Sequence, residues 1–137
     1  MIATIVSVGY QGRSVDELID VLRAGAVKLL VDVRLNPISR KAGFSKNPLS
    51  QALAEAGIRY RHERSLGNPR DNRDPFDRER CEAYLVANGS EVLAEIMELA
   101  RSTRIALLCY ERQHRDCHRS CILDVAAQQH AVRVLKS

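Results

Sequence analysis

Apolar segments and amphipathic segments alternate along most of the chain. Residues 2–8 are apolar and β-branched, and residues 27–33 are nearly all apolar, as expected of a strand that is covered on both faces. Residues 14–25 begin with a Ser-Val-Asp-Glu capping box, carry one apolar helical face and end at a glycine. The first 33 residues therefore predict a strand, a helix and a second strand.

The same alternation continues to the end of the chain. Asn47-Pro48 is typical of an N-cap and first helical position, and the helix that follows is expected to end at Gly57. Residues 58–62 alternate as a less buried strand does, and the Gly, Pro and charges of residues 65–75 predict a long loop. The remaining pattern predicts helices over 76–87 and 90–101, separated by Asn88-Gly89, a strand over 104–110, a helix over 117–129 and a short strand over 132–135.

Strand-helix alternation of this kind is typical of parallel strands joined by right-handed crossovers. We therefore expect one α/β domain over residues 1–137, with an open, mostly parallel sheet of about five strands and helices on both faces, a Rossmann-like arrangement. Ligands of such sheets bind beyond the carboxyl ends of the strands. The polar segments that should converge there are Gly9-Tyr10, Asp32 to Arg34, His62 to Gly67 and Cys109 to Glu111.

The composition, 45% apolar and 28% charged, is that of an ordinary globular protein. The first residues resemble neither a signal peptide nor a membrane span, so we expect a cytoplasmic protein with no membrane partner and with reduced cysteines. Arg outnumbers Lys 17 to 4, and the net charge is +4. Guanidinium groups bind phosphate and carboxylate well, so this bias favours an anionic partner, although an Arg-rich proteome explains it equally well.

The densest cluster of reactive side chains is Cys117-His118-Arg119, which Asp116 is placed to cap as the first turn of a helix. A helix N-terminus beside an arginine favours a bound anion, and it favours the thiolate form of Cys117. The alternative is that Cys117 packs inward with Cys121, one turn further on, while His118 and Arg119 lie at the surface.

Cys109 stands where an apolar strand ends, a usual place for a catalytic side chain in this architecture. Cys109 and Arg115 have the Cys-x5-Arg spacing of cysteine phosphatases, but no glycine lies between them, and Glu111 would put a carboxylate in the phosphate cradle. Zinc, iron or haem is a further alternative, since Cys109, His114, Cys117 and His118 are suitable ligands, although no Cys-x2-Cys pair is present.

Asp32 and Arg34 lie two residues apart after a buried strand, so that Asp32 can orient Arg34 toward a ligand. Ser39 and Arg40 follow in a loop shaped by Pro37. A purely structural Asp-Arg pair that closes the sheet edge explains the first two residues equally well. The seven Arg and five acidic residues within 59–80 form only a weak candidate for a nucleic-acid groove, because the charges are mixed and aromatic residues are few.

Taken together, these motifs resemble the domain-of-unknown-function 488 family. The resemblance rests on Asp32-Val33-Arg34 with Pro37 and Ser39-Arg40, on Phe44-Ser45-Lys46, on Gly57 to His62 with Leu66-Gly67, on Cys109-Tyr110-Glu111 and on Cys117-His118-Arg119. One departure is Gln11-Gly12, where the family commonly has Ser after its Gly-Tyr or Gly-His turn. The resemblance implies an α/β sandwich and a site made of Asp32, Arg34, Ser39, Arg40, Cys109, Glu111, Cys117, His118 and Arg119, but it implies no reaction.

The leading hypothesis is a site for an anionic ligand, a nucleotide or a nucleic-acid phosphate, with no cofactor. Arg34, Arg40 and Arg119 would hold the anion in one cleft at the sheet edge. Cys109 or Cys117 would act as nucleophile or redox thiol, with His118 as proton carrier and Glu111 or Asp32 as orienting group. A non-catalytic nucleic-acid-binding module and a metal- or haem-binding protein are the alternatives. Whether the protein is an enzyme, its reaction and its oligomeric state are left open.

Overall fold

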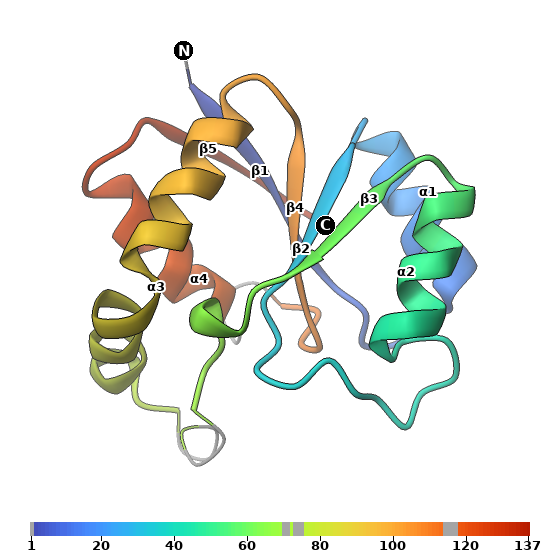
Figure 1. Cartoon of the computed structure of the whole chain (residues 1–137), viewed down its shortest axis with the longest axis horizontal. Coiled ribbons are helices and arrows are strands. Elements are labelled where there is room, and N and C mark those ends of the chain that lie inside the picture. The colour runs from blue at the N-terminus through green and yellow to red at the C-terminus, as the bar shows by residue number, and fades with distance from the viewer. Residues whose placement is uncertain (1, 70–71, 73–75, 114–117) are drawn as a thin grey trace.

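Five parallel strands form one open sheet in the order β3-β2-β4-β1-β5 (Figure 1). The computed structural model describes residues 2–69, 72, 76–113 and 118–137. The expected α/β fold with a sheet of about five strands is confirmed, and the sheet is all-parallel. The strands are β1 (Ala3–Gly9), β2 (Leu29–Asp32), β3 (Arg59–His62), β4 (Ile105–Cys109) and β5 (Val132–Lys136). The helices are α1 (Val15–Ala24), α2 (Lys46–Glu55), α3 (Arg78–Ala100) and α4 (His118–Ala127), with a short 3₁₀ helix η1 (Arg64–Leu66).

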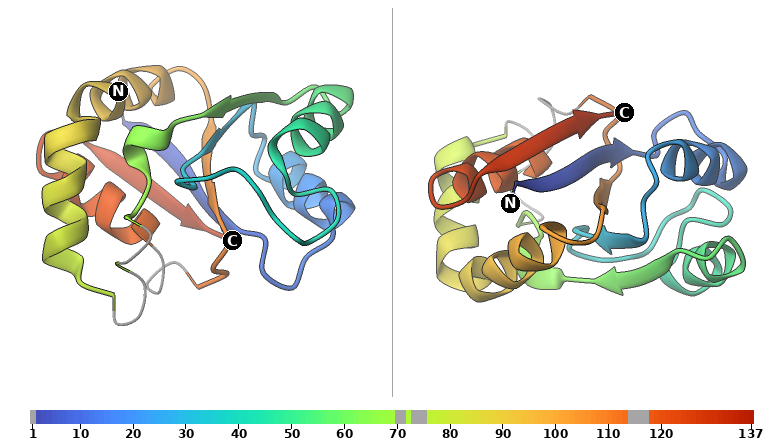
Figure 2. Two further views of the ribbon diagram at one scale, coloured as in Figure 1. Left: turned by 60° about the horizontal axis from the view of Figure 1, so that its bottom comes forward. Right: turned by 90° about the horizontal axis from the view of Figure 1, so that it is seen from above.

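Helices cover both faces of this sheet, α1 and α2 on one and α3 and α4 on the other (Figures 1 and 2). Successive residues of a strand point to opposite faces, so each strand feeds two cores. In β4, Leu107 packs into the core under α3 and α4, whereas Leu108 packs into the core under α1 and α2. The central strands are therefore apolar on both sides, which explains their nearly continuous runs of apolar residues.

Helix α1 begins and ends where the sequence predicts. Ser14 Oγ accepts from the Glu17 backbone, the Glu17 carboxylate accepts from the Ser14 backbone, and Gly25 is the C-cap. Helix α2 begins earlier than predicted, at Lys46 with Ser45 as N-cap, so the expected N-cap at Asn47 is wrong. Pro48 is still tolerated because backbone N–H groups in the first helical turn have no intrahelical partner.

The conformation at the C-terminus of α2 explains why Gly57 follows this helix. The C-cap is Ala56, one residue before the position expected, and Gly57 follows with φ of +78°. Gly57 N donates to Ala54 O at 3.0 Å, and Ile58 N donates to Leu53 O at 2.9 Å. These two bonds are those of a Schellman motif, in which the left-handed residue is usually glycine.

Helix α3 is continuous from Arg78 to Ala100, so the predicted break at Asn88-Gly89 is wrong. Gly89 lies inside the helix, where a Cβ atom would come within 2.7 Å of the Ser65 carbonyl oxygen. The glycine therefore serves close packing of α3 on η1 rather than a turn. Among the described residues, no helix is both long enough and apolar enough to span a membrane.

Strands β1 and β4 are neighbours, with Gly9 in register with Cys109, yet they lead to opposite sides of the sheet. The chain passes from β1 to α1 on one face, whereas α4, the helix after β4, lies on the other face. A position where successive connections diverge in this way leaves a crevice beyond the strand ends, which is where ligands bind in open α/β sheets. The sheet order thus places a potential site between the ends of β1, β2 and β4.

Candidate functional site

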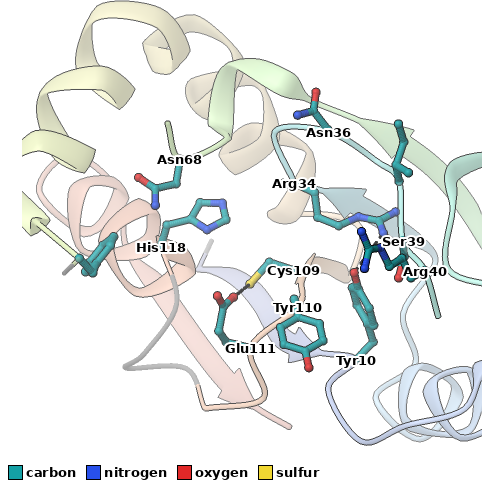
Figure 3. A pocket seen from close by; sticks show the side chains of 12 residues that line it. Tyr10, Arg34, Asn36, Ser39, Arg40, Asn68, Cys109, Tyr110, Glu111 and His118 are labelled. Carbon is teal, nitrogen blue, oxygen red and sulfur yellow. Dashed lines mark hydrogen bonds between the residues drawn. The ribbon is translucent and has the colours of Figure 1, made fainter. Parts of the chain in front are cut away.

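A cavity of about 310 Å³ lies at this carboxyl edge of the sheet (Figure 3). Its volume is at the lower end of the range for small-molecule sites. Five regions of the chain supply its walls: the segment after β1, the segment after β2, the loop between η1 and α3, the end of β4, and the first turn of α4. The lining residues are Tyr10, Arg34, Asn36, Ile38, Ser39, Arg40, Asn68, Phe76, Cys109, Tyr110, Glu111 and His118.

Arg34 is anchored by the buried Asp32, as the sequence spacing predicted. Asp32 Oδ1 accepts from Arg34 Nε at 2.9 Å and from the Arg34 backbone N–H at 3.1 Å, and Asp32 Oδ2 accepts from Nη2 at 2.7 Å. Burial alone would lower the pKa of Arg34, but the hydrogen bonds and charge of Asp32 outweigh it and raise that pKa above its usual value. Asp32 itself is fully buried and does not line the cavity.

The second amino group of Arg34 is held as well. Its Nη1 donates to the Phe44 carbonyl at 2.6 Å and to the Tyr10 hydroxyl at 3.3 Å. A guanidinium has five N–H groups, and these bonds, with those to Asp32, occupy four of them. One N–H on Nη2 is left for a ligand. Arg34 therefore contributes a fixed positive charge more than a set of free donors.

Two tyrosines form hydrogen bonds with the Asp32–Arg34 pair, Tyr60 behind the cavity lining and Tyr10 within it. Tyr60 donates to Asp32 Oδ2 at 2.5 Å, and burial together with that bond raises the pKa of Tyr60. Tyr10 stacks on Phe44 with ring centroids 4.5 Å apart, and its ring meets Tyr110 edge-on at 5.4 Å. Tyr110 is 49% exposed, so it presents an aromatic surface to solvent at the cavity.

Arg40 differs from Arg34 in having no fixed partner. It is exposed, lines the cavity, and forms no hydrogen bond or ion pair with any described residue. The loop that carries it is held in place, because the Ser39 backbone N–H donates to Ser45 Oγ at 3.0 Å and Ser39 Oγ accepts from the Lys41 backbone N–H at 3.1 Å. Figure 3 shows Arg34, Ser39 and Arg40 on one side of the cavity and His118 and Asn68 on the other.

Two imidazoles bind successive carbonyl groups just after β2. His118 Nε2 lies 2.8 Å from the Val33 oxygen, and His62 Nε2 lies 2.7 Å from the Arg34 oxygen. Carbonyl oxygens only accept, so Nε2 carries the hydrogen in both rings. His118 thus joins the first turn of α4 to the end of β2, which brings the Cys-His-Arg motif and the Asp-Val-Arg motif to the same cavity through His118 and Arg34.

Cys109 and Glu111 lie at the end of β4. Cys109 Sγ is 3.5 Å from Glu111 Oε2, and both residues line the cavity (Figure 3). Cys109 is disulfide-bonded, contrary to the expectation that all four cysteines are reduced, whereas Cys81 and Cys121 are free and buried. A sulfur atom in a disulfide is not a thiolate, so Cys109 is not available as a nucleophile in this state.

Arg119 takes a different position from the other predicted ligands. Its exposed fraction is 0%, it does not line the cavity, and its Nη2 donates to the Glu111 carbonyl. Cys117, the remaining predicted site residue, lies outside the described residues, as do His114, Arg115 and Asp116. Within the described part of the chain, no three His, Cys, Asp or Glu side chains are grouped closely enough to hold a metal ion.

Several lining residues were missed by the sequence reasoning. Tyr10 and Tyr110 lie in two of the segments expected to converge at the sheet edge, although neither was chosen as a site residue. Asn36 and Ile38 lie inside the motif that carries Arg34 and Ser39. Asn68 and Phe76 come from the loop before α3, and no local pattern indicates that this loop reaches the cavity.

The comparisons with known proteins agree with the motifs. No curated protein and no solved structure matches the chain. A family model described as a domain of unknown function, DUF488, matches residues 14–126. This span includes every lining residue of the cavity except Tyr10, and it leaves out strands β1 and β5. The chain therefore belongs to the DUF488 family.

Proposed function

We propose that the cavity binds a nucleotide, with a phosphate group at Arg40 and the base against exposed apolar side chains that line the cavity. The observation that carries this proposal is the presence, in one cavity, of Arg40, which has no partner among the described residues, and of exposed apolar side chains. A nucleotide has the two matching parts, an anionic group and a flat ring. A simple inorganic anion would make no favourable contact with the exposed apolar side chains.

The phosphate end of the site rests on Arg40. Its guanidinium forms no hydrogen bond or ion pair among the described residues and can form a bidentate pair with phosphate. Arg34 adds one N–H and a positive charge that Asp32 keeps in place. The charge of Arg34 is largely balanced by Asp32, whereas that of Arg40 is not. We therefore assign the larger share of anion affinity to Arg40.

The base end of the site rests on Tyr110, Ile38 and Phe76. Ile38 is 78% exposed and Tyr110 is 49% exposed, and both line the cavity. Large exposed apolar side chains have no reason to gather at a polar cavity unless a ligand covers them. Stacking on an aromatic ring contributes about 1–3 kcal/mol per base and suits any base.

The amides at the cavity add hydrogen-bonding capacity. Asn36 Oδ1 accepts from Arg64 at 2.8 Å, which leaves the Asn36 amide N–H groups available to a ligand oxygen or ring nitrogen. Asn68, in contrast, exchanges hydrogen bonds with Asn72 through both its amide oxygen and its amide nitrogen. We expect Asn36 to contact the ligand and Asn68 to support the wall.

A small-molecule site is favoured over an extended nucleic-acid groove. Arg61 forms ion pairs with Glu63 and Glu95, and Arg78 forms one with Asp124. The arginine-rich stretch of residues 59–80 is therefore partly neutralised within the protein. A groove that tracks a polynucleotide backbone needs unpaired positive charge along its length.

Thermal unfolding with and without nucleotides tests the proposal. A ligand at about one hundred times its Kd stabilises the native state by roughly 2.7 kcal/mol, which corresponds to a rise of several degrees in Tm. Nucleoside mono-, di- and triphosphates are the probes, and sodium chloride at matched ionic strength is the control. We expect Arg40→Ala to abolish most of the rise and Tyr110→Ser to reduce it.

Arg23→Ala is the matched control, because Arg23 is exposed on α1 away from the cavity and its loss changes the net charge by the same amount. It should respond to nucleotides as the wild type does. The proposal is wrong if no nucleotide raises Tm beyond the chloride control, or if Arg40→Ala and Arg23→Ala respond alike.

A further inference from the structure

Three arginines converge on the junction between the end of β1 and the segment after β4. Arg13 lies in the turn after β1, Arg112 follows Glu111, and Arg119 comes from the first turn of α4. None of the three lines the cavity described above. We call Arg13, Arg112 and Arg119 the arginine cluster.

The backbone contact between Gly9 and Glu111 brings this cluster together. A Cβ atom at Gly9 would overlap with the Glu111 carbonyl and lie 2.8 Å from Arg112 Cα, so the two segments touch directly. Arg13 Nη1 donates to the Gly9 carbonyl at 2.8 Å, and Arg119 Nη2 donates to the Glu111 carbonyl. Two guanidiniums are thus anchored on residues in contact.

Arg112 approaches the same turn from the outside. Its backbone N–H donates to Gln11 Oε1 at 3.2 Å, and its Nη1 would lie 3.6 Å from a Cβ atom at Gly12. The Arg112 side chain is exposed, whereas Arg13 is mostly buried and Arg119 is fully buried. The cluster therefore runs from the surface to the interior.

The hydrogen-bonding capacity of the cluster is largely unused. Arg119 Nε and Nη1 are buried and have no hydrogen-bond partner. In the part of the chain that the structure describes, none of the three guanidiniums forms an ion pair. Burying a charge without a partner is costly, and buried guanidiniums normally have both an anion and hydrogen bonds.

Arg119 does not escape this cost by losing its proton. Burial lowers the pKa of Arg119 to about 10, against the attraction of Glu111 and with the help of repulsion from Arg13. Burial and the charge of Arg112 also lower the pKa of Arg13. A group with a pKa of about 10 remains protonated at neutral pH, so the positive charge in the interior stays.

Two acids lie near the cluster, since Glu17 attracts Arg13 and Glu111 attracts Arg119. The Glu111 carboxylate lies 3.5 Å from Cys109 Sγ at the cavity, and the Glu17 carboxylate accepts from the Ser14 backbone N–H in the capping box. Neither forms an ion pair with the cluster in the described structure. In the described part of the chain these acids act on the cluster beyond ion-pair distance, and Arg13 Nη1 also donates to the Ser137 oxygen at 3.3 Å. A bound anion would supply the direct ion pair that the cluster lacks there.

We propose that Arg13, Arg112 and Arg119 form a second anion-binding site, separate from the cavity, which takes a phosphate group. A phosphate is tetrahedral and carries several acceptor oxygens, so it would pair with the exposed Arg112 from the surface. The unused N–H groups of Arg119 are buried, so a phosphate would reach them only if the segment around Arg112 shifts. The phosphate group can be a free anion or part of a nucleic-acid backbone, and both present the same chemistry to the cluster.

Inorganic phosphate tests the site without reference to nucleotides. Phosphate should raise the Tm of the wild type more than sodium chloride does at matched ionic strength. Arg112→Ala removes an exposed side chain, so it should fold and lose most of this rise. Arg119→Lys keeps the charge but not the planar fork, and we expect it to lose the rise as well. Arg23→Ala should respond as the wild type does.

Arg40→Ala separates this proposal from the proposed function. It should reduce the Tm rise that nucleotides produce and leave the rise with inorganic phosphate unchanged, whereas Arg112→Ala should lose the rise with inorganic phosphate. The second site is ruled out if phosphate has no effect beyond chloride, or if Arg112→Ala responds to phosphate as the wild type does.

A trinucleotide without terminal phosphates distinguishes the two sources of the phosphate group. If the backbone supplies it, Arg112→Ala weakens trinucleotide binding, measured by calorimetry, several-fold relative to Arg23→Ala. If a free anion is the occupant, the trinucleotide does not compete with inorganic phosphate. Both results support the site. If Arg112→Ala still binds both phosphate and the trinucleotide as the wild type does, the second anion-binding site is contradicted.

Discussion

Four of the five N–H groups of Arg34 are bound to the protein, whereas Arg40 has no described partner and Arg119 is buried with two unbound nitrogens. The sequence predicted one shared role for these three arginines. It correctly predicted that Asp32 orients Arg34, because residues two apart after a strand point the same way. It could not distinguish Arg40 from Arg119, since burial depends on segments far apart in the chain.

The hydrogen bond between Tyr60 and Asp32 makes the free energy of unfolding depend on pH in the alkaline range. Burial and Asp32 raise the pKa of Tyr60, so this group binds its proton more tightly in the folded state. Its contribution to the free energy of unfolding is complete below the ordinary tyrosine pKa of about 10 and is lost as pH rises above it. Urea unfolding of wild type and Tyr60→Phe should differ by about 1–3 kcal/mol at pH 8, and the gap should narrow above pH 10. A gap that stays constant or widens would contradict this assignment.

At the scale of elements, the capping box of α1 was predictable because its signal is local. The unbroken helix α3 was not, because Asn88-Gly89 has the local appearance of a turn. A glycine is needed at position 89 because η1, which belongs to another part of the chain, packs closely against the helix there. The N-terminus of α2 was misplaced for a related reason, since Pro is acceptable at several positions of a first helical turn.

Gly89→Ala tests this account, because two effects act in opposite directions. Helix propensity alone predicts a stabilisation of up to about 1 kcal/mol. The added Cβ atom would lie 2.7 Å from the Ser65 carbonyl and 3.0 Å from the side chains of Leu66 and Leu85, which predicts a loss of about 1–3 kcal/mol. We expect a net loss in urea unfolding. Asn88→Ala, at an exposed neighbouring position, should change stability by no more than about 0.5 kcal/mol. Stabilisation by Gly89→Ala would show that η1 can move aside.

At the scale of the whole molecule, the order β3-β2-β4-β1-β5 decides which motifs meet. The alternation of strands and helices predicted a parallel sheet and a site at its carboxyl edge. It did not predict that β4 lies between β1 and β2, because strand order depends on how both cores are packed. That order puts Arg34, Cys109 and His118 on one cavity and places Arg119 on the other side of the Glu111 segment.

The cavity and the arginine cluster both depend on the backbone contact between Gly9 and Glu111. The Glu111 segment forms a wall of the cavity, and its carbonyl anchors Arg119, while the Gly9 carbonyl anchors Arg13. Gly9→Ala should force β1 and the segment after β4 apart, since the new Cβ atom would overlap with the Glu111 carbonyl and the Arg112 backbone.

We expect Gly9→Ala to be destabilised by several kcal/mol, about the upper range for single substitutions, and to lose the Tm rise with both nucleotide and phosphate. Gly25→Ala is the matched control, because a Cβ atom there would make only ordinary contacts of 3.5–3.6 Å. It should unfold near the wild-type temperature and keep both responses. If folded Gly9→Ala retains either response in full, that site does not depend on the contact between Gly9 and Glu111.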